Sequence, residues 1–295
     1  MPKNKLVKPF VKWAGGKRQL MDEIRKYIPK RISIYYEPFL GGGAVWFELQ
    51  PKKYVVNDIN KEMINVYRTI KTDVDALITE LKTHRNEPEI FYQVREMDRT
   101  PEYQELTPVQ RAARIIYLNK TCFNGLFRVN SQGYFNVPFG NYKNPDIINE
   151  ITLRAVHKFL NESEGDIFNE DFEVVMKGAK KGSFVYLDPP YDPVSDSSSF
   201  TGYTLDGFGR AEQIRLKNAC DELHAKGCKF LLSNSSTPFI RELYADYHVI
   251  TVQANRNINA NGNGRGRIDE VLIMNYEPEK TVPKAQKALA ALDEK

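Results

Sequence analysis

Short segments typical of β-strands alternate with longer segments typical of helices along most of the chain, and this alternation constrains the fold more than any other feature. The apolar run Phe184–Leu187, for example, has the length of a buried strand, and the mixed segment 210–226 has the length and composition of a helix. Such alternation is typical of a mainly parallel sheet covered by helices on both faces. We therefore predict an α/β fold with a Rossmann-like, doubly wound sheet.

The expected elements follow one another closely. We expect strands at 34–37, 54–57, near 166–168, 184–187, 229–233, near 248–253 and near 268–275, and helices from the first glycine turn to 49 and at 61–71, 74–84, near 88–97, 108–122, 149–161, near 210–226 and 237–244. An Asn/Gly-rich loop joins the last two strands, so we expect them to form an antiparallel pair at the edge of the sheet.

One long segment, residues 61–148, interrupts the alternation. Its first part is expected to be helical, and its second part, 123–145, is rich in Asn, Gly, Phe and Tyr. Gln132-Gly133 stands between two strand-like runs, which predicts a β-hairpin. The predicted organisation is a discontinuous sheet domain at 1–60 and 149–278, an inserted helical and β-hairpin domain at 61–148, and a C-terminal tail at 279–295.

A glycine turn follows the first expected strand. Glu37 ends that strand, Gly41-Gly42-Gly43 forms the turn, and Asp58 ends the second strand. Glycines let the backbone approach a ligand closely, and an acid at the end of the second strand can accept hydrogen bonds from two ribose hydroxyls. Because the glycines are contiguous rather than spaced as GxGxxG, they favour a nucleoside without a pyrophosphate, such as S-adenosylmethionine. The alternative is an ordinary turn in an α/β protein, with Asp58 capping the next helix.

A second motif, Asp188-Pro189-Pro190-Tyr191, follows the apolar strand Phe184–Leu187. Ligands of open α/β sheets bind at this end of the strands. The two prolines carry no N–H donors, so the motif offers acceptors, namely the Asp188 carboxylate and the Pro189 carbonyl, beside the flat ring of Tyr191. This combination suits an amino group on a planar base, because two acceptors can take its two N–H bonds while the ring stacks on the tyrosine.

The charge of the chain is unevenly distributed around a net value of +4. Residues 1–31 hold ten Lys and Arg against two acids, and segments 108–145 and 247–268 hold five and three basic residues without an acid. Three basic stretches suit a polyanionic partner, although each stretch alone is also compatible with a solvated surface.

Other sequence features narrow the class of protein. Cys122, Cys220 and Cys228 are too few and too scattered for a disulfide framework or a zinc site. No apolar run reaches the roughly 18 residues of a membrane span, and the N-terminal residues do not resemble a secretion signal. We therefore expect a cytoplasmic protein that uses neither a metal nor a membrane.

Four segments occur in the order found in one known family. They are Phe10–Lys17, Glu37–Gly43, Asn57–Asn60 and Asp188–Tyr191. On these residues the chain resembles, over about residues 8–277, the DNA adenine methylase (Dam) family in its alpha-group arrangement. The resemblance implies an S-adenosylmethionine-dependent enzyme that methylates the N6 amine of adenine in double-stranded DNA, within GATC, and makes the insert at 61–148 its target-recognition domain.

The resemblance also implies roles for individual residues. Lys17 would lie near the methionine carboxylate of the cofactor, Asp58 would hold the ribose hydroxyls, and the turn at Asp171 and Phe172 would hold the adenine ring. The implied cofactor-binding set is Trp13, Lys17, Glu37, Phe39, Gly41, Gly43, Asp58, Ile59, Asp171, Phe172 and Asp188. The implied catalytic set is Asp188, Pro189, Pro190 and Tyr191, and no metal ligand is expected.

The same resemblance makes 119–145 the hairpin that reads the DNA major groove. Phe123 stands in place of a tyrosine that wedges into the duplex, Lys12 matches a residue that contacts the outer guanine, and Asn141 departs from the basic residue common there. The implied DNA-binding set is Lys12, Phe123, Leu126, Arg128, Pro138 and Asn141. A two-stranded ribbon fits the major groove, and Arg128 can contact guanine through two hydrogen bonds.

Three loops are expected near the reaction. Because the target amine is paired inside the duplex, the adenine must rotate out to reach Tyr191. We expect residues 192–209 to close over it, with Phe200 or Tyr203 supplying an apolar contact. We also expect Ser233–Ser235 to line the same pocket, and the loop 255–267 to follow phosphates through Arg256, Arg265 and Arg267.

Two other interpretations stay open from the residues alone. One is methylation of another planar amine, namely cytosine N4 or an RNA base; Asp rather than Ser or Asn before Pro-Pro favours adenine. The other is a non-catalytic DNA-binding module, against which the intact Trp13, Lys17, Asp58 and Asp188 argue. A companion restriction endonuclease and a monomeric or weakly dimeric state complete the expectations.

Overall fold

The computed structural model describes residues 3–13, 15–17, 19–194, 207–255 and 267–278, with backbone only for the ends of the last two strands. Its centre is a seven-stranded sheet in the order β3-β2-β1-β4-β5-β7-β6. The strands are β1 (Tyr35–Glu37), β2 (Lys53–Asn57), β3 (Glu164–Phe168), β4 (Phe184–Leu187), β5 (Lys229–Ser235), β6 (His248–Asn255) and β7 (Arg267–Met274). The strands β1 to β5 are parallel, and β7 is antiparallel to both of its neighbours. The predicted Rossmann-like sheet and its antiparallel edge pair are confirmed.

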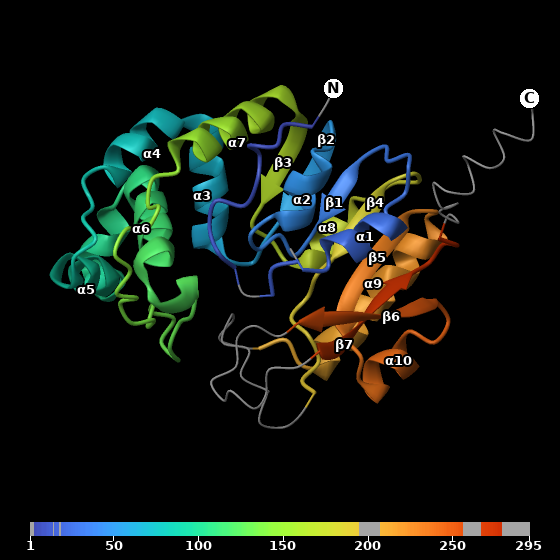
Figure 1. Ribbon diagram of the computed structural model, residues 1–295. Helices are drawn as coiled ribbons and strands as arrows, with labels where there is room; N and C mark the ends of the chain where they lie inside the picture. The colour runs from blue at the N-terminus through green and yellow to red at the C-terminus, as the bar shows by residue number, and fades with distance from the viewer. Residues whose placement is uncertain (1–2, 14, 18, 195–206, 256–266, 279–295) are drawn as a thin grey trace, which may run out of the picture.

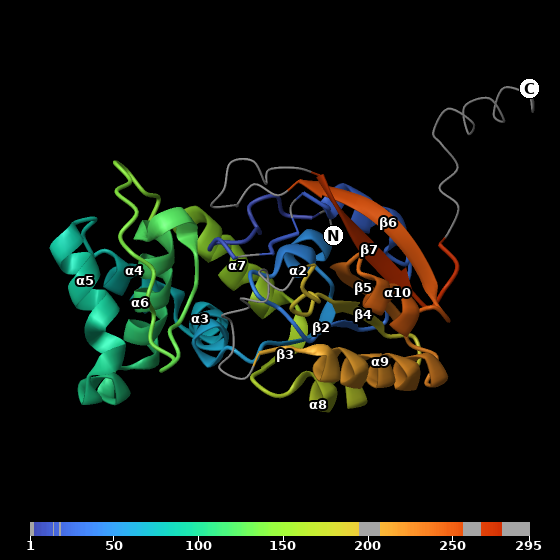
Figure 2. The same cartoon turned by 90° about the horizontal axis from the view of Figure 1, so that it is seen from below.

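Helices cover both faces of the sheet, because side chains alternate between the faces along each strand. On β4, Val185 and Leu187 join one apolar cluster, while Phe184 and Tyr186 join the other. The first cluster packs against α8 (Phe172–Lys177), α9 (Arg210–Ala225) and α10 (Pro238–Leu243), and the second against α1 (Met21–Tyr27), α2 (Ala44–Leu49), α3 (Lys61–Thr72) and α7 (Glu150–Glu162). Figure 2 shows α8 and α9 on one side of the strands and α2 on the other.

A group of helices extends beyond the β3 edge of the sheet (Figure 1). It contains α4 (Val74–Leu81), α5 (Pro88–Glu96) and α6 (Pro108–Thr121). The short 3₁₀ helices η1 (Met97–Arg99) and η2 (Pro101–Glu105) join α5 to α6, and η3 (Phe123–Gly125) follows α6. Thr107 and Gln110 form a reciprocal capping box at the start of α6, and Pro108 occupies its first turn. The apolar cluster on this side of the sheet continues without interruption into α3, α4 and α6. The division into domains at residues 61 and 149 stays a prediction.

The structure corrects several local predictions. Two helices, α1 and α8, were not anticipated. The segment 123–145 folds back on itself, but only isolated bridges, Cys122 with Phe139 and Val129 with Phe135, replace the expected strands. The alternative role of Asp58 as a helix cap is wrong, because the Asn60 side chain caps α3 by accepting a hydrogen bond from the Met63 amide.

No helix in the described part of the chain has the length and apolar character needed to cross a bilayer. The predicted tail at 279–295 lies outside the described residues.

Candidate active site

The two motifs singled out in the sequence meet where the strand order reverses. From the centre outward, β1, β2 and β3 form one side of the sheet, and β4 starts the other side directly beside β1. The glycine turn follows β1 and Asp188 follows β4. Such a reversal opens a crevice at the carboxyl ends of the strands, where doubly wound sheets bind ligands.

The glycine turn is shaped by Trp13. Gly41 has φ +47°, and a Cβ atom built on it would lie 2.7 Å from the Trp13 Cδ1 atom. Gly43 has φ +65°, and a Cβ atom there would lie 3.0 Å from the Tyr67 hydroxyl oxygen. The backbone conformation and the close approach of two side chains therefore both require glycine. The Trp13 ring also stacks on Phe127, with ring centroids 5.2 Å apart, and so connects the turn to the hairpin segment.

Asp58 ties the glycine turn to the end of β2. Its Oδ2 accepts a hydrogen bond from the Gly41 amide at 2.7 Å, and its Oδ1 accepts one from the Asn60 amide at 2.9 Å. Burial raises the pKa of the Asp58 carboxyl, and these two amide donors oppose that rise. Each carboxylate oxygen keeps a free lone pair, so the group can still accept hydrogen bonds from a ligand.

Asp188 is held by two side chains. Its Oδ1 lies 2.7 Å from the Lys17 Nζ and accepts a hydrogen bond from the Ser233 hydroxyl at 3.0 Å. Lys17 is only 6% exposed, and its amine also donates to the Gly15 carbonyl at 2.7 Å. Burial raises the pKa of Asp188, and the charge of Lys17 is the main influence that lowers it. The Lys17 amine is thus engaged with Asp188, whereas the family resemblance implies a position near the cofactor carboxylate.

Tyr191 lies beside this ion pair. The Lys17 Nζ stands 4.8 Å from the centroid of the Tyr191 ring, and the Tyr191 hydroxyl donates a hydrogen bond to the Glu270 carboxylate at 2.8 Å. Glu270 lies on β7, and no feature of the sequence singled it out. Burial raises the pKa of Tyr191 well above its ordinary value, and the neighbouring carboxylates of Asp188 and Glu270 add to this, so the hydroxyl remains a donor.

The residue after the motif, Asp192, is almost fully buried. Its carboxylate accepts a hydrogen bond from the Thr237 hydroxyl at 2.7 Å, and its carbonyl accepts one from the Ser235 hydroxyl at 2.7 Å. Ser233 contacts Asp188, so Ser233 reaches the motif itself and Ser235 reaches the residue that follows it. Sequence reasoning pointed to this segment but missed Thr237, and it assigned Asp192 to the closing loop rather than to a buried position.

A buried acid ends β1 next to Asp188. Glu37 is 2% exposed and accepts a hydrogen bond from the Tyr35 hydroxyl at 2.7 Å. Burial raises the pKa of Glu37 well above its ordinary value, the hydrogen bond from Tyr35 opposes this, and the nearby charge of Asp188 adds to it. At the crevice Glu37 therefore provides a group that holds its proton more tightly than an exposed glutamate does.

Aromatic side chains gather beyond the glycine turn. The rings of Phe39 and Phe172 lie 5.2 Å apart, and Phe208 packs against both. Asp171 caps α8 by accepting a hydrogen bond from the Glu173 amide, and its carboxylate pairs with Arg215 at 2.7 Å. Ile59, at the end of β2, is 59% exposed. These residues provide apolar surfaces on the same side of the crevice as Asp58.

The hairpin segment carries the residues predicted to contact DNA. Phe123 is 51% exposed, an unusual state for a phenylalanine in the absence of a partner. Arg128 is exposed, and its Nε donates to the Asn136 side chain at 2.7 Å across the hairpin. Leu126 is half-buried, and Pro138 and Asn141 are exposed. Asn141 has φ +52°, a conformation that asparagine tolerates better than a basic residue does.

Lys12 joins the N-terminal segment to this hairpin. Its backbone N–H donates to the Asn119 side chain at 2.9 Å, and its carbonyl accepts from the same side chain at 2.7 Å. A Cβ atom on Gly125 would lie 2.5 Å from the Lys12 side chain, so these segments pack tightly. The exposed Lys12 amine lies 5.5 Å from the centroid of the Tyr142 ring.

Some predicted residues cannot be placed. Phe200, Tyr203, Arg256 and Arg265 lie outside the described residues, as do the side chain of Arg267 and most of the expected closing loop at 192–209.

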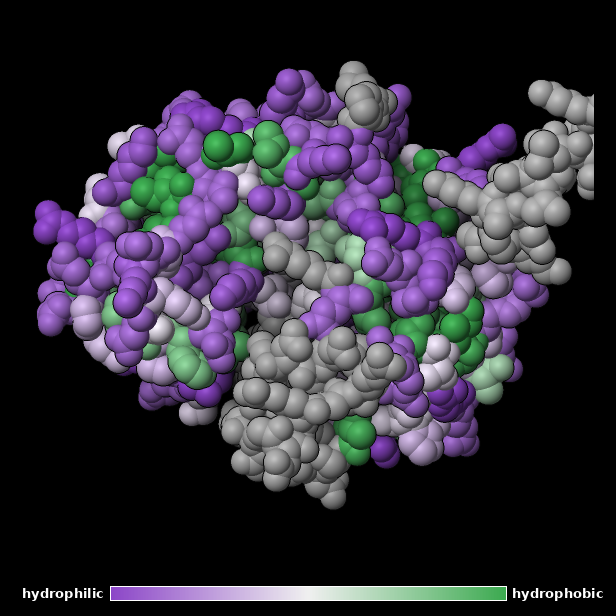
Figure 3. Space-filling view, in the orientation of Figure 1, coloured by the Kyte–Doolittle hydropathy of each residue, from purple (hydrophilic) through white to green (hydrophobic). Residues whose placement is uncertain are grey.

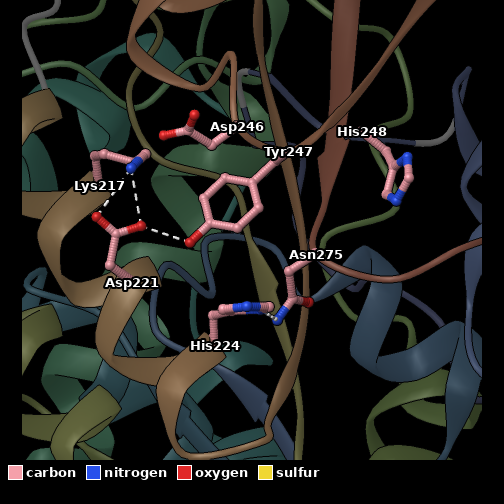
Figure 4. A pocket seen from close by; sticks show the side chains of 7 residues that line it. All are labelled: Lys217, Asp221, His224, Asp246, Tyr247, His248 and Asn275. Atoms are coloured by element: carbon pink, nitrogen blue, oxygen red, sulfur yellow. Dashed lines mark hydrogen bonds and ion pairs between the residues drawn. The ribbon is translucent and has the colours of Figure 1, made fainter.

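A cavity of about 390 Å³ lies at the opposite end of the sheet (Figure 4). Its walls contain Lys217, Asp221, His224, Asp246, Tyr247, His248 and Asn275. In its wall Lys217 forms an ion pair with Asp221, and the Tyr247 hydroxyl donates a hydrogen bond to the same carboxylate. None of the lining residues belongs to the two motifs. Within the described residues no cluster of His, Cys, Asp or Glu could hold a metal ion.

Comparison with known proteins agrees with this geometry. Residues 13–258 match the family described as D12 class N6 adenine-specific DNA methyltransferase. The chain is 43% identical over 279 residues to the type II methyltransferase M1.LlaDCHI of Lactococcus lactis subsp. cremoris, covering 94% of this chain and 98% of that protein. It is 44% identical over 290 residues to the type II methyltransferase M.MjaIII of Methanocaldococcus jannaschii, covering 92% and 99%. It is 36% identical over 281 residues to a DNA adenine methylase of Salmonella typhi, covering 93% and 97%.

Proposed function

The chain belongs to the D12 class N6 adenine-specific DNA methyltransferases, and from this premise we propose how it works: it takes the methyl group from S-adenosylmethionine and transfers it to adenine within GATC after the base has left the helix. The observation that carries the proposal is the meeting of the glycine turn and the Asp188 motif at the reversal between β1 and β4. A methyl donor bound at the turn and an amine bound at Asp188 would then face each other across one crevice.

The residues at the turn fit S-adenosylmethionine. The buried Asp58 carboxylate can accept from ribose hydroxyls, and exposed Ile59 with the ring of Phe39 offers apolar surface to an adenine. The raised pKa of Glu37 disfavours a second negative charge beside Asp188. When bound, the sulfonium supplies an activated methyl whose leaving group is a neutral thioether.

Asp188 and the Pro189 carbonyl would bind the target amine. The lone pair of an adenine amine is delocalised into the ring, so the amine is a poor nucleophile. Two acceptors outside the ring plane draw its nitrogen toward tetrahedral geometry and free the lone pair. Lys17 and Ser233 hold Asp188 in its acceptor form and orientation, and Tyr191 offers its ring for stacking. Positioning of this kind must supply about 8 kcal/mol or more of the barrier reduction.

The hairpin and the N-terminal segment would bind the duplex. Arg128 uses part of its guanidinium on Asn136 and retains donors for a guanine edge, and exposed Phe123 can fill the space that a flipped adenine leaves. Lys12 belongs to the most basic stretch of the chain and lies beside the hairpin. The face of the molecule in Figure 3 is mostly hydrophilic, with apolar residues in separate patches.

A panel of duplexes tests the substrate and the donor. Protein incubated with methyl-labelled S-adenosylmethionine should label a GATC duplex and not a GTTC duplex. Digestion of the product should yield N6-methyladenine. Label on cytosine or only on RNA would contradict the proposed substrate, and label on adenine outside GATC would contradict the proposed sequence while leaving the reaction intact.

A companion restriction endonuclease, a monomeric or weakly dimeric state and a cytoplasmic location are further parts of the proposal. They rest on the resemblance and the composition.

A further inference from the structure

The backbone on each side of Tyr191 is held by a buried amide side chain. The Pro190 carbonyl, before the ring, accepts a hydrogen bond from the Gln213 Nε2 at 2.8 Å. The Asp192 N–H, after the ring, donates to the Asn234 Oδ1 at 3.1 Å. Gln213 comes from α9 and Asn234 from β5, so two consecutive elements outside the motif hold one short loop.

The two amides also bind each other. The Asn234 Nδ2 donates to the Gln213 Oε1 at 3.1 Å, and both side chains are fully buried. Donation therefore runs in one direction, from the Asp192 amide through Asn234 and Gln213 to the Pro190 carbonyl. Turning either side-chain amide over would place two acceptors or two donors against each other, so only one orientation satisfies every group.

We propose that Gln213 and Asn234, which we call the amide bridge, are positioning residues that set the orientation of Tyr191 for methyl transfer. The inference rests on the proposed function and extends it to residues outside the motif. The bridge fixes the loop before and after Tyr191, and Glu270 fixes the far end of its ring through the hydroxyl. With its backbone held on both sides and its hydroxyl bound to Glu270, the Tyr191 ring can stack on a base without reorganising. This preserves the alignment of the adenine amine with the methyl group.

The substitution Gln213→Glu tests the direction of the bridge. A protonated carboxyl at this position can donate to the Pro190 carbonyl as the amide does, whereas a carboxylate repels it. At the acid end of the kcat–pH profile, the kcat of Gln213→Glu should therefore lie within about threefold of the wild-type kcat. As the pH rises, the ratio of the variant kcat to the wild-type kcat should fall about tenfold or more. Gln213→Met fills a similar volume without a donor, and its relative kcat should be low at every pH.

The control is the same chemical change at Asn275, which bridges backbone groups at the opposite end of β5 and also lines the remote cavity (Figure 4). Asn275→Asp should keep a relative kcat without pH dependence. All rates are measured at saturating DNA and donor, well below the melting temperature of each variant. A pH-independent relative kcat for Gln213→Glu, or the same fall with pH in Asn275→Asp, would overturn the inference.

Hydrogen exchange gives a readout that does not depend on activity. Pro189 and Pro190 have no N–H, so exchange within Pro189–Asp192 comes from Tyr191 and Asp192 alone. Gln213→Met should speed exchange there and leave β4 protected; unchanged exchange would count against the bridge. A wild-type protein that transfers no methyl to any DNA would instead refute the proposed function, and the exchange result would still decide whether the bridge holds the loop.

Discussion

The Lys17 amine lies 2.7 Å from the Asp188 carboxylate and 4.8 Å from the centroid of the Tyr191 ring. Lys17 arrives from the N-terminal segment and Asp188 from the end of β4, so the first residues of the fold help to set the charge of the site. Truncating or neutralising one partner of such a buried pair leaves the other without compensation.

Lys17→Met should shift the acid limb of the kcat–pH profile toward higher pH. Asp188 must be ionised to accept a hydrogen bond from the adenine amine. Methyl transfer is therefore lost as the pH falls through the pKa of Asp188. Burial raises this pKa and Lys17 lowers it, so removing the lysine raises the pKa further. At neutral pH we expect the kcat of Lys17→Met to be about one tenth of the wild-type value or below. The exposed Lys158→Met on α7 is the control and should leave the profile unchanged; a shift toward lower pH would refute the role of Lys17.

Glu37→Gln should flatten the pH dependence of stability. The folded state raises the pKa of Glu37 above its unfolded value, so it binds this proton more tightly. The stabilisation of the folded state by protonated Glu37 is therefore complete below the ordinary glutamate pKa. It is lost as the pH rises through the raised pKa of the folded state. Urea unfolding at several pH values measures it. The free energy of unfolding of Glu37→Gln should change less over that pH interval than that of wild type. The exposed control Glu162→Gln should behave as wild type. A steeper pH dependence in Glu37→Gln would contradict the assignment.

Phe123→Ala should affect base flipping without affecting the fold. Because Phe123 is 51% exposed, its removal should change the free energy of unfolding by only about 0.5 kcal/mol. The fluorescence of 2-aminopurine at the target position should rise less on binding, since the vacated space in the duplex is no longer filled. Buried Phe127, which stacks on Trp13, is the contrast: Phe127→Ala should cost about 3–5 kcal/mol of stability. A rise in 2-aminopurine fluorescence as large as that with wild type would contradict the proposed role of Phe123 as a wedge.

Arg128→Ala should relax sequence selection. Loss of a two-bond contact to guanine should cost about 1–3 kcal/mol of discrimination at one base pair and little elsewhere. Exposed Lys143, in the same segment, is the comparison: Lys143→Ala should weaken binding to all duplexes equally and lower the salt dependence. Binding titrations on single-substituted duplexes separate the two effects, and uniform weakening by Arg128→Ala would show that it contacts phosphate instead.

The alternation of strands and helices and the position of both motifs were predictable from the sequence, because a glycine turn and an Asp-Pro-Pro motif after apolar strands are local signals. The helix α8 was also within reach, since Asp171 can cap it and Phe172, Val175 and Met176 share one face. It was missed because the segment had been interpreted only as a turn.

Other features depend on contacts between distant residues. Gln213 and Asn234 are ordinary in their own segments, and only the packing of α9 against β5 brings them to Tyr191. The bond from Tyr191 to Glu270 depends on β7 entering the sheet between β5 and β6, which the sequence does not indicate. The hairpin was expected as regular strands, but its backbone pairs at isolated points and Asn141 adopts a positive φ.

In the proposed mechanism Asp188 binds the target amine opposite the methyl donor, and the variant Asp188→Ala is the direct test of this role. Methyl transfer to a GATC duplex and affinity for that duplex should be determined on the same preparation. We expect the variant to form no detectable N6-methyladenine while its affinity for DNA stays within about threefold of wild type. Methyl transfer at the wild-type rate by Asp188→Ala would contradict this role of Asp188.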